Sequence, residues 1–83
     1  MKKFEIWERV NDGEWDQSSD MEPIEAENEK EALAIYIDSI RDILDTMDAK
    51  LVNIDSYSAI FQYVNEAGTG ITTDEFRVAE VKN

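Results

Sequence analysis

The sequence predicts an α+β domain in which an antiparallel sheet of four to five strands carries one long amphipathic helix on one face. Residues from Glu29 to about Met47 place apolar side chains every three or four positions, which is the helical period. Shorter stretches on both sides alternate apolar and polar residues, which is typical of half-buried strands. Turn residues separate these stretches in pairs and favour hairpins before and after the helix. The 83 residues are expected to form one domain, residues 1–83.

The predicted helix has a start signal and a single apolar stripe. Asn28 can cap its first turn, and Glu31, three residues later, completes a pair typical of a capping box. At about 100° per residue the apolar side chains fall within a stripe roughly 120° wide, as a helix lying on a sheet requires. These side chains are Leu33, Tyr36, Ile37, Ile40, Ile43, Leu44 and Met47.

A hairpin is expected before the helix. Its first strand covers residues 3–10, where Phe4 and Val10 would both point to the buried side. Asn11-Asp12-Gly13 then supplies residues that tolerate positive φ in a tight turn. The chain would return as a short strand over residues 14–17.

The remaining segments are assigned by their turn residues and their alternation. Pro23 makes Met21–Glu27 either an edge strand or an irregular lead-in to the helix. After the helix, Leu51–Ile54 is either a connection or the start of a strand. Tyr57–Val64 and Thr73–Val81 are clearer strands, and a flexible turn with two glycines joins them.

The charge balance is the strongest compositional signal. Twenty acidic residues against eight basic ones give a net charge of −12. This charge argues against direct nucleic-acid binding, which needs Lys and Arg on phosphates, and against binding to anionic membranes. It favours a basic protein partner, or it serves solubility alone.

Several classes of chemistry are disfavoured by residues that the chain lacks. It contains no histidine and no cysteine, which removes the commonest general base, the thiol nucleophile and the softer metal ligands. We therefore expect a protein that is not an enzyme and that binds no cofactor. No apolar run approaches about 18 residues, and acidic residues interrupt the start of the chain, so neither a membrane span nor a signal peptide is expected. A cytoplasmic location is the expectation.

Oxygen-bearing side chains at every second position resemble part of a calcium-binding loop. An EF-hand loop needs Gly at its sixth position and Glu at its twelfth, where this chain has Gln17 and Pro23. We therefore expect no metal site and assign these side chains to a solvated face of the hairpin. They are Asp12, Glu14, Asp16, Ser18 and Asp20.

The polar face of the helix is a candidate binding surface. Asp38, Asp42 and Asp45 would lie within roughly 60° of one another, spaced by one turn or about 6 Å. The later two fall in the last turns, where the helix dipole disfavours anions by about 0.3–1 kcal/mol each. Ile35 lies beside this row and could anchor a partner. The alternative is a face that only keeps the protein soluble.

Trp15 near the hairpin tip is a second candidate anchor, although packing over its own sheet is the favoured explanation of this ring. The full set of candidate partner-binding residues is Asp12, Glu14, Trp15, Asp16, Asp20, Ile35, Asp38, Asp42 and Asp45.

In size, acidity, lack of cysteine and histidine, and α+β layout, the chain resembles small phage-encoded anti-defence proteins such as anti-CRISPRs, several of which are DNA mimics. The resemblance implies a non-enzymatic inhibitor whose acidic surface docks on a basic, nucleic-acid-binding site of a partner protein. A nuclease effector or a DNA-binding protein of host defence would be the target. Carboxylates one helical turn apart repeat at nearly the phosphate spacing of about 7 Å, so they can satisfy the same Arg and Lys side chains.

Two other functions remain open. Asp12-Gly13, Ile24-Glu25-Ala26 and Glu31-Ala32-Leu33 resemble the layout of HicB-type antitoxins, which implies a regulatory module. Such antitoxins usually carry a DNA-binding segment, and this chain has no basic helix to supply one. The other function is a small domain that pairs by a sheet edge with another copy or another chain, with the last strand or the Pro23 segment as that edge.

Overall fold

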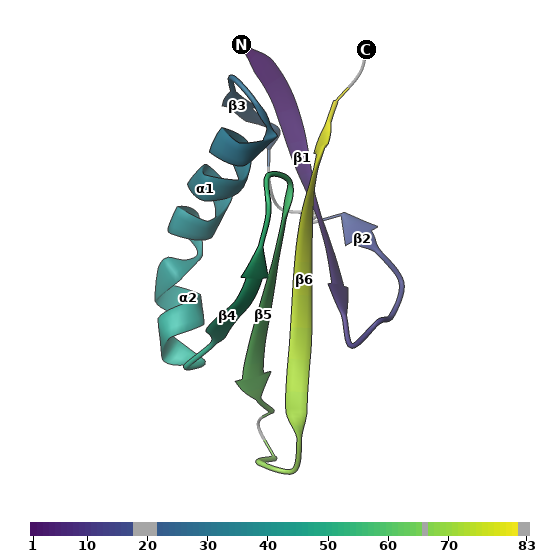
Figure 1. Cartoon of the computed structure of the whole chain (residues 1–83), viewed down its shortest axis with the longest axis vertical. Helices are drawn as coiled ribbons and strands as arrows, with labels where there is room; N and C mark the ends of the chain where they lie inside the picture. Colours follow the sequence, from purple (N-terminus) through teal and green to yellow (C-terminus); the bar gives the residue numbers. More distant parts are fainter. Residues whose placement is uncertain (18–21, 66, 82–83) are drawn as a thin grey trace.

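The computed structural model describes residues 1–17, 22–65 and 67–81, and shows a six-stranded antiparallel sheet with two consecutive helices on one face (Figure 1). The predicted α+β class is confirmed, with six strands rather than four to five. The elements in chain order are β1 (Lys2–Val10), β2 (Asp16–Gln17), β3 (Ile24–Ala26), α1 (Glu29–Ser39), α2 (Arg41–Thr46), β4 (Lys50–Ile54), β5 (Ser58–Val64) and β6 (Ile71–Glu80).

The sheet runs in the order β2-β1-β6-β5-β4, and β3 also pairs with β1. The last strand therefore lies between β1 and β5, and its assignment as a sheet edge is wrong. The segment after Pro23 pairs with β1 alone within the described sheet, as expected for an edge strand. Residues 51–54 belong to a strand, β4, at the other end of the sheet.

The long helix of the prediction is wrong, because the helix is interrupted at Ile40. The backbone there has φ −107° and ψ 11°, and the Ile40 N–H donates to both the Tyr36 and the Ile37 carbonyls at 3.2 Å. The Ser39 hydroxyl also donates to the Tyr36 carbonyl at 2.6 Å, a bond that bends helices. Beyond this break Leu44 stays buried, whereas Ile43 is 60% exposed and leaves the predicted stripe.

The start of α1 is as predicted. The Asn28 side-chain oxygen accepts a hydrogen bond from the Glu31 backbone N–H at 2.9 Å. This bond satisfies one of the backbone N–H groups that the first turn of a helix leaves without an intrahelical partner.

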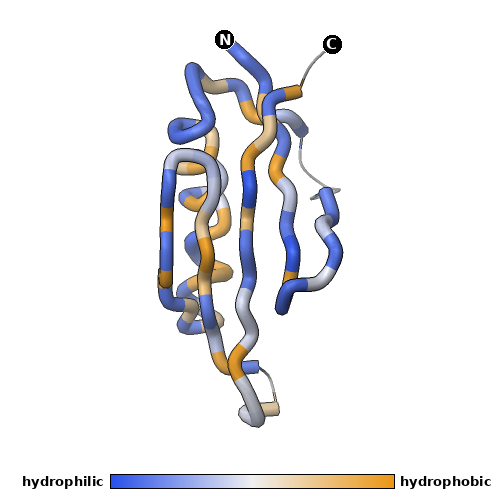
Figure 2. The backbone as a smooth tube through the Cα atoms, turned by 45° about the vertical axis from the view of Figure 1, so that its right-hand side comes forward, coloured by the Kyte–Doolittle hydropathy of each residue, from blue (hydrophilic) through white to orange (hydrophobic). Residues whose placement is uncertain are grey.

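The core lies between the helices and the inner face of the sheet. Hydrophobic and hydrophilic residues alternate along the long strands (Figure 2), so each strand buries one side. Phe76 on β6 is central, with ring centroids 5.3 Å from Tyr36 on α1 and 6.1 Å from Phe61 on β5. Phe4 at the start of β1 is fully buried, but Val10 at its end is exposed, which corrects the predicted burial of that residue.

The turn after β1 forms as predicted, but the return strand is shorter. Asn11 and Asp12 have φ of 52° and 60°, and the Gly13 N–H donates to the Val10 carbonyl at 3.0 Å, as in the tight turn favoured by hairpins. Only residues 16–17 pair with β1, instead of the expected 14–17. On the other edge of β1, Asn11 is bonded to Thr73 through both its N–H and its side-chain oxygen, each at 2.8 Å, so the start of the turn is tied to the segment of β6 beside it.

Candidate functional site

The helices carry the predicted acidic row on their solvent side. Asp38, Asp42 and Asp45 are all exposed. Asp38 faces Arg41 at 3.3 Å, whereas neither Asp42 nor Asp45 has an ion pair among the described residues. No basic residue lies in the last turn of α2, so the negative end of that helix is not neutralised locally. We name Asp38, Asp42 and Asp45 the acidic row.

The hairpin acids lie on a different surface. Asp12, Glu14 and Asp16 are exposed around β2, on the side of the molecule opposite α2 (Figure 1). Asp12 lies 3.9 Å from Arg9. Asp20 falls outside the described residues. The structure thus does not bring the hairpin acids together with the acidic row, and the predicted set divides into two surfaces.

Trp15 packs over its own sheet. The guanidinium groups of Arg9 and Arg77 each lie 4.8 Å from the ring centroid, and Arg9 also binds Glu75 at 2.8 Å. These contacts hold the half-buried ring against the outer face of the sheet. Packing over the sheet is the explanation that the sequence favoured over contact with a partner. Ile35, in contrast, projects from α1 and is 43% exposed.

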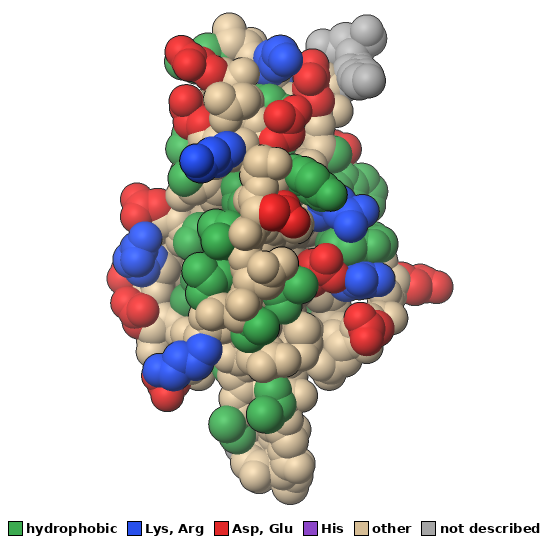
Figure 3. Space-filling model, viewed as in Figure 1, with side chains coloured by type: hydrophobic (Ala, Val, Ile, Leu, Met, Phe, Trp, Pro, Cys, Tyr) green, Lys and Arg blue, Asp and Glu red, His purple; other side chains and the backbone are tan. Residues whose placement is uncertain are grey.

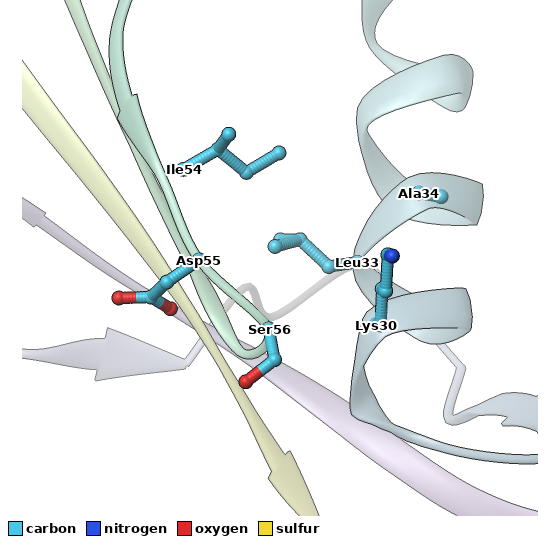
Figure 4. Close-up of a pocket in the computed structure, with 6 residues that line it drawn as sticks. All are labelled: Lys30, Leu33, Ala34, Ile54, Asp55 and Ser56. Carbon is cyan, nitrogen blue, oxygen red and sulfur yellow. The ribbon is translucent and has the colours of Figure 1, made fainter.

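An apolar groove, which the sequence did not indicate, runs between the helices and β4. Two hollows of about 390 and 410 Å³ share Ala34 and Ile54 and so form one depression. Hydrophobic side chains gather along it, with charged groups at its margins (Figure 3). Leu33 from α1 and Ile54 from β4 point toward one another across it, whereas the Asp55 carboxylate turns away (Figure 4).

A β-bulge in β4 builds one wall of the groove. The pairing with β5 shifts between Leu51 and Asn53, so Val52 is an extra residue. Leu51 then pairs with Phe61, and Ile54 with Ala59, although the two β4 residues are three apart in sequence. A bulge changes the side to which the following side chains point, so Leu51 and Ile54 both face the helices. Adjacent apolar residues that break the alternation of a short strand are the signal that could have indicated this bulge.

Two carboxyl groups lie beneath α2, of which Asp74 is buried and Glu8 is half-buried. Asp74 on β6 is only 8% exposed, and its Oδ1 has no hydrogen-bond partner among the described residues. Burial raises the pKa of Asp74 to about 8, and the hydrogen bond to Glu8 and the charge of Glu8 act in the same direction. Burial, followed by the charges of Asp74 and Glu8, also raises the pKa of Tyr63.

Asp74 and Glu8 line a third hollow of about 300 Å³, together with Tyr63 and apolar residues of α2. Because burial disfavours the charged form of Asp74, ionisation of this carboxyl opposes the packing around the hollow. Asp74, Phe76 and Val78 are two residues apart along one strand and so lie on the same face. The sequence could therefore have placed Asp74 on the buried side.

In the described segments, neither helix has the length and apolar character that crossing a bilayer requires. The same segments contain no cluster of three or more acidic side chains arranged to hold a metal ion. Comparisons with protein families, with characterised proteins and with solved structures gave no match for this chain.

Proposed function

We propose that this chain is a non-enzymatic inhibitor that docks its acidic row on a basic, nucleic-acid-binding site of a partner protein, in the manner of an anti-CRISPR-like decoy. The observation that carries the proposal is the exposure of Asp38, Asp42 and Asp45 on consecutive helices, two of them without an ion pair among the described residues.

The row combines two sources of negative potential. Its carboxylates are held on a packed scaffold, so a partner does not have to order them on binding. The C-terminal end of α2 adds the partial negative charge of the helix dipole, and no basic residue lies in the last turn to offset it. Lys and Arg side chains that normally hold phosphates are attracted by such a field, and the net charge of −12 speeds their approach.

The competing explanation is that the acids only keep the protein soluble, and a pair of matched variants separates the two. The helix variant replaces the acidic row: Asp38→Asn, Asp42→Asn and Asp45→Asn. The control variant removes the same charge around β3, where all three residues are exposed. Its changes are Glu22→Gln, Glu25→Gln and Glu27→Gln.

Each immobilised protein is used to capture partners from a lysate of the source cell, with and without competing duplex DNA. We expect the wild type and the control variant to retain a basic protein that DNA and salt release, and the helix variant to retain at least about tenfold less. Equal capture by all three would show that the acidic row is not the site. Urea unfolding of each variant checks that the fold is kept. Capture of a ribonuclease that DNA does not displace would instead favour the antitoxin-like alternative.

A further inference from the structure

The apolar groove is lined by as many basic as acidic residues, although the chain as a whole is very acidic. The charged residues that line its two hollows are two cations and two anions: Lys30, Arg41, Asp45 and Asp55. The chain as a whole carries −12. Two copies that approach by any strongly acidic face repel each other, whereas this surface adds no net charge.

The groove is also open and apolar at its centre. Ile54 is 53% exposed and Leu51 is 51% exposed on the β4 side. Ala34, exposed on α1, belongs to both hollows. Exposed apolar side chains around a depression mark interaction surfaces in soluble proteins.

Pairing of β4 with another strand is disfavoured. The strand is short, begins with Lys50 and contains the bulge at Val52, and all three features protect sheet edges from further pairing. Contact through this surface therefore involves side chains of the groove rather than backbone hydrogen bonds.

The charges of the groove are arranged so that they suit a twofold axis. Lys30 lines one hollow and Asp45 lines the other, with Ala34 and Ile54 shared between them. A twofold axis through the shared residues exchanges the two hollows, so each Lys30 approaches Asp45 of the second copy. Arg41 is already occupied by Asp38 within the chain.

We infer that this groove is the interface of a symmetric homodimer, in which the Ala34–Ile54 surfaces of two copies pack together and Lys30 pairs with Asp45 across the axis. The inference does not rest on the proposed inhibitory function, because a dimer would form without any partner protein. Asp45 lies at the margin shared by the groove and the acidic row, whereas Asp38 and Asp42 do not line the groove.

Sedimentation velocity of the full chain tests the inference. We expect a dimer that forms over a range from about 1 μM to about 1 mM, typical of a modest interface, and that salt strengthens or leaves unchanged because screening reduces repulsion between the copies. Ile54→Ser should raise the dimer dissociation constant at least tenfold. Val64→Ser is the matched control, since Val64 is 64% exposed and lies outside the groove, and it should leave the constant unchanged.

Charge-reversal variants test whether Lys30 of one copy pairs with Asp45 of the other. Lys30→Glu and Asp45→Lys should each weaken the dimer, and the double variant should restore it. Because the chain has no cysteine, a single Ala34→Cys should also cross-link two copies under oxidising conditions, whereas Ile71→Cys, at the start of β6, should not.

A monomer at all concentrations overturns the inference, as does equal weakening by the serine variants at 54 and 64. Failure of the charge swap to restore the dimer overturns the proposed axis. The dimer is measured on the purified chain alone, and the variants at Lys30, Ala34 and Ile54 lie outside the acidic row, so the two proposals fail separately.

Discussion

Replacing Asp74 with asparagine should stabilise the fold above neutral pH. Asp74 is buried, and the neighbouring Glu8 carboxyl opposes its ionisation, so the pKa of Asp74 rises from 3.8 to about 8. At about 1.4 kcal/mol per pKa unit, ionising it in the folded protein costs roughly 6 kcal/mol. An amide left with an unpaired polar atom costs about 1–3 kcal/mol. We therefore expect the asparagine variant to gain about 3–5 kcal/mol of unfolding free energy at pH 8.5.

The sign of the pH dependence follows from proton counting. Between about pH 4 and pH 8 the folded state holds a proton on Asp74 that the unfolded chain has released. The unfolding free energy of the wild type therefore falls as pH rises across this window, by up to about 1.4 kcal/mol per unit. The stabilisation linked to the proton on Asp74 is fully present below about pH 4 and is lost above about pH 8. The variant lacks this dependence, so the two curves approach each other toward low pH and separate toward high pH.

Urea unfolding followed by tryptophan fluorescence at a series of pH values between 5 and 9 measures both curves. Asp42→Asn is the control, because Asp42 is exposed and the change likewise replaces one carboxyl group with an amide. The unfolding free energy of this control should fall with pH at the same slope as that of the wild type. Parallel curves for the wild type and the Asp74 variant would refute the argument that this carboxyl is held protonated by burial.

Three further changes test the packing of the fold, each by urea unfolding against the wild type. Leu33→Ala removes a side chain that is 1% exposed and should cost about 2–5 kcal/mol; a loss below 1 kcal/mol would contradict its place in the core. Asn28→Ala removes the cap of α1 and should cost about 1 kcal/mol, whereas Asn28→Asp, which keeps a capping oxygen, should cost little. Trp15→Ala removes the ring between two guanidinium groups and should cost at least about 1 kcal/mol; no loss would indicate a ring that is free for a partner.

Local signals in the sequence were sufficient for much of the fold. The buried side of β1 near Phe4, the positive-φ turn at Asn11-Asp12 and the cap at Asn28 each depend on neighbouring residues alone, and the structure has all three. The strand order was not predictable in this way. Alternation places residues on a face, but it does not say which strands are neighbours, so the central position of β6 was missed.

The helix break shows the same limit. The apolar period continues through Ile40, but the helix is interrupted there, next to a hydrogen bond from the Ser39 hydroxyl to the Tyr36 carbonyl that the period does not reveal. For the site, the exposure of the acidic row followed from helical spacing. The groove did not, because it depends on the bulge at Val52 and on the distance between β4 and the helices.

The salt dependence of the captured partner's association constant tests the proposed function most directly. For the wild type we expect the constant to fall at least about tenfold between about 50 mM and 300 mM NaCl, and to fall much less for the helix variant, because its three carboxylates no longer contribute. An association constant that is independent of salt, or a salt dependence identical in the two proteins, would contradict docking through Asp38, Asp42 and Asp45.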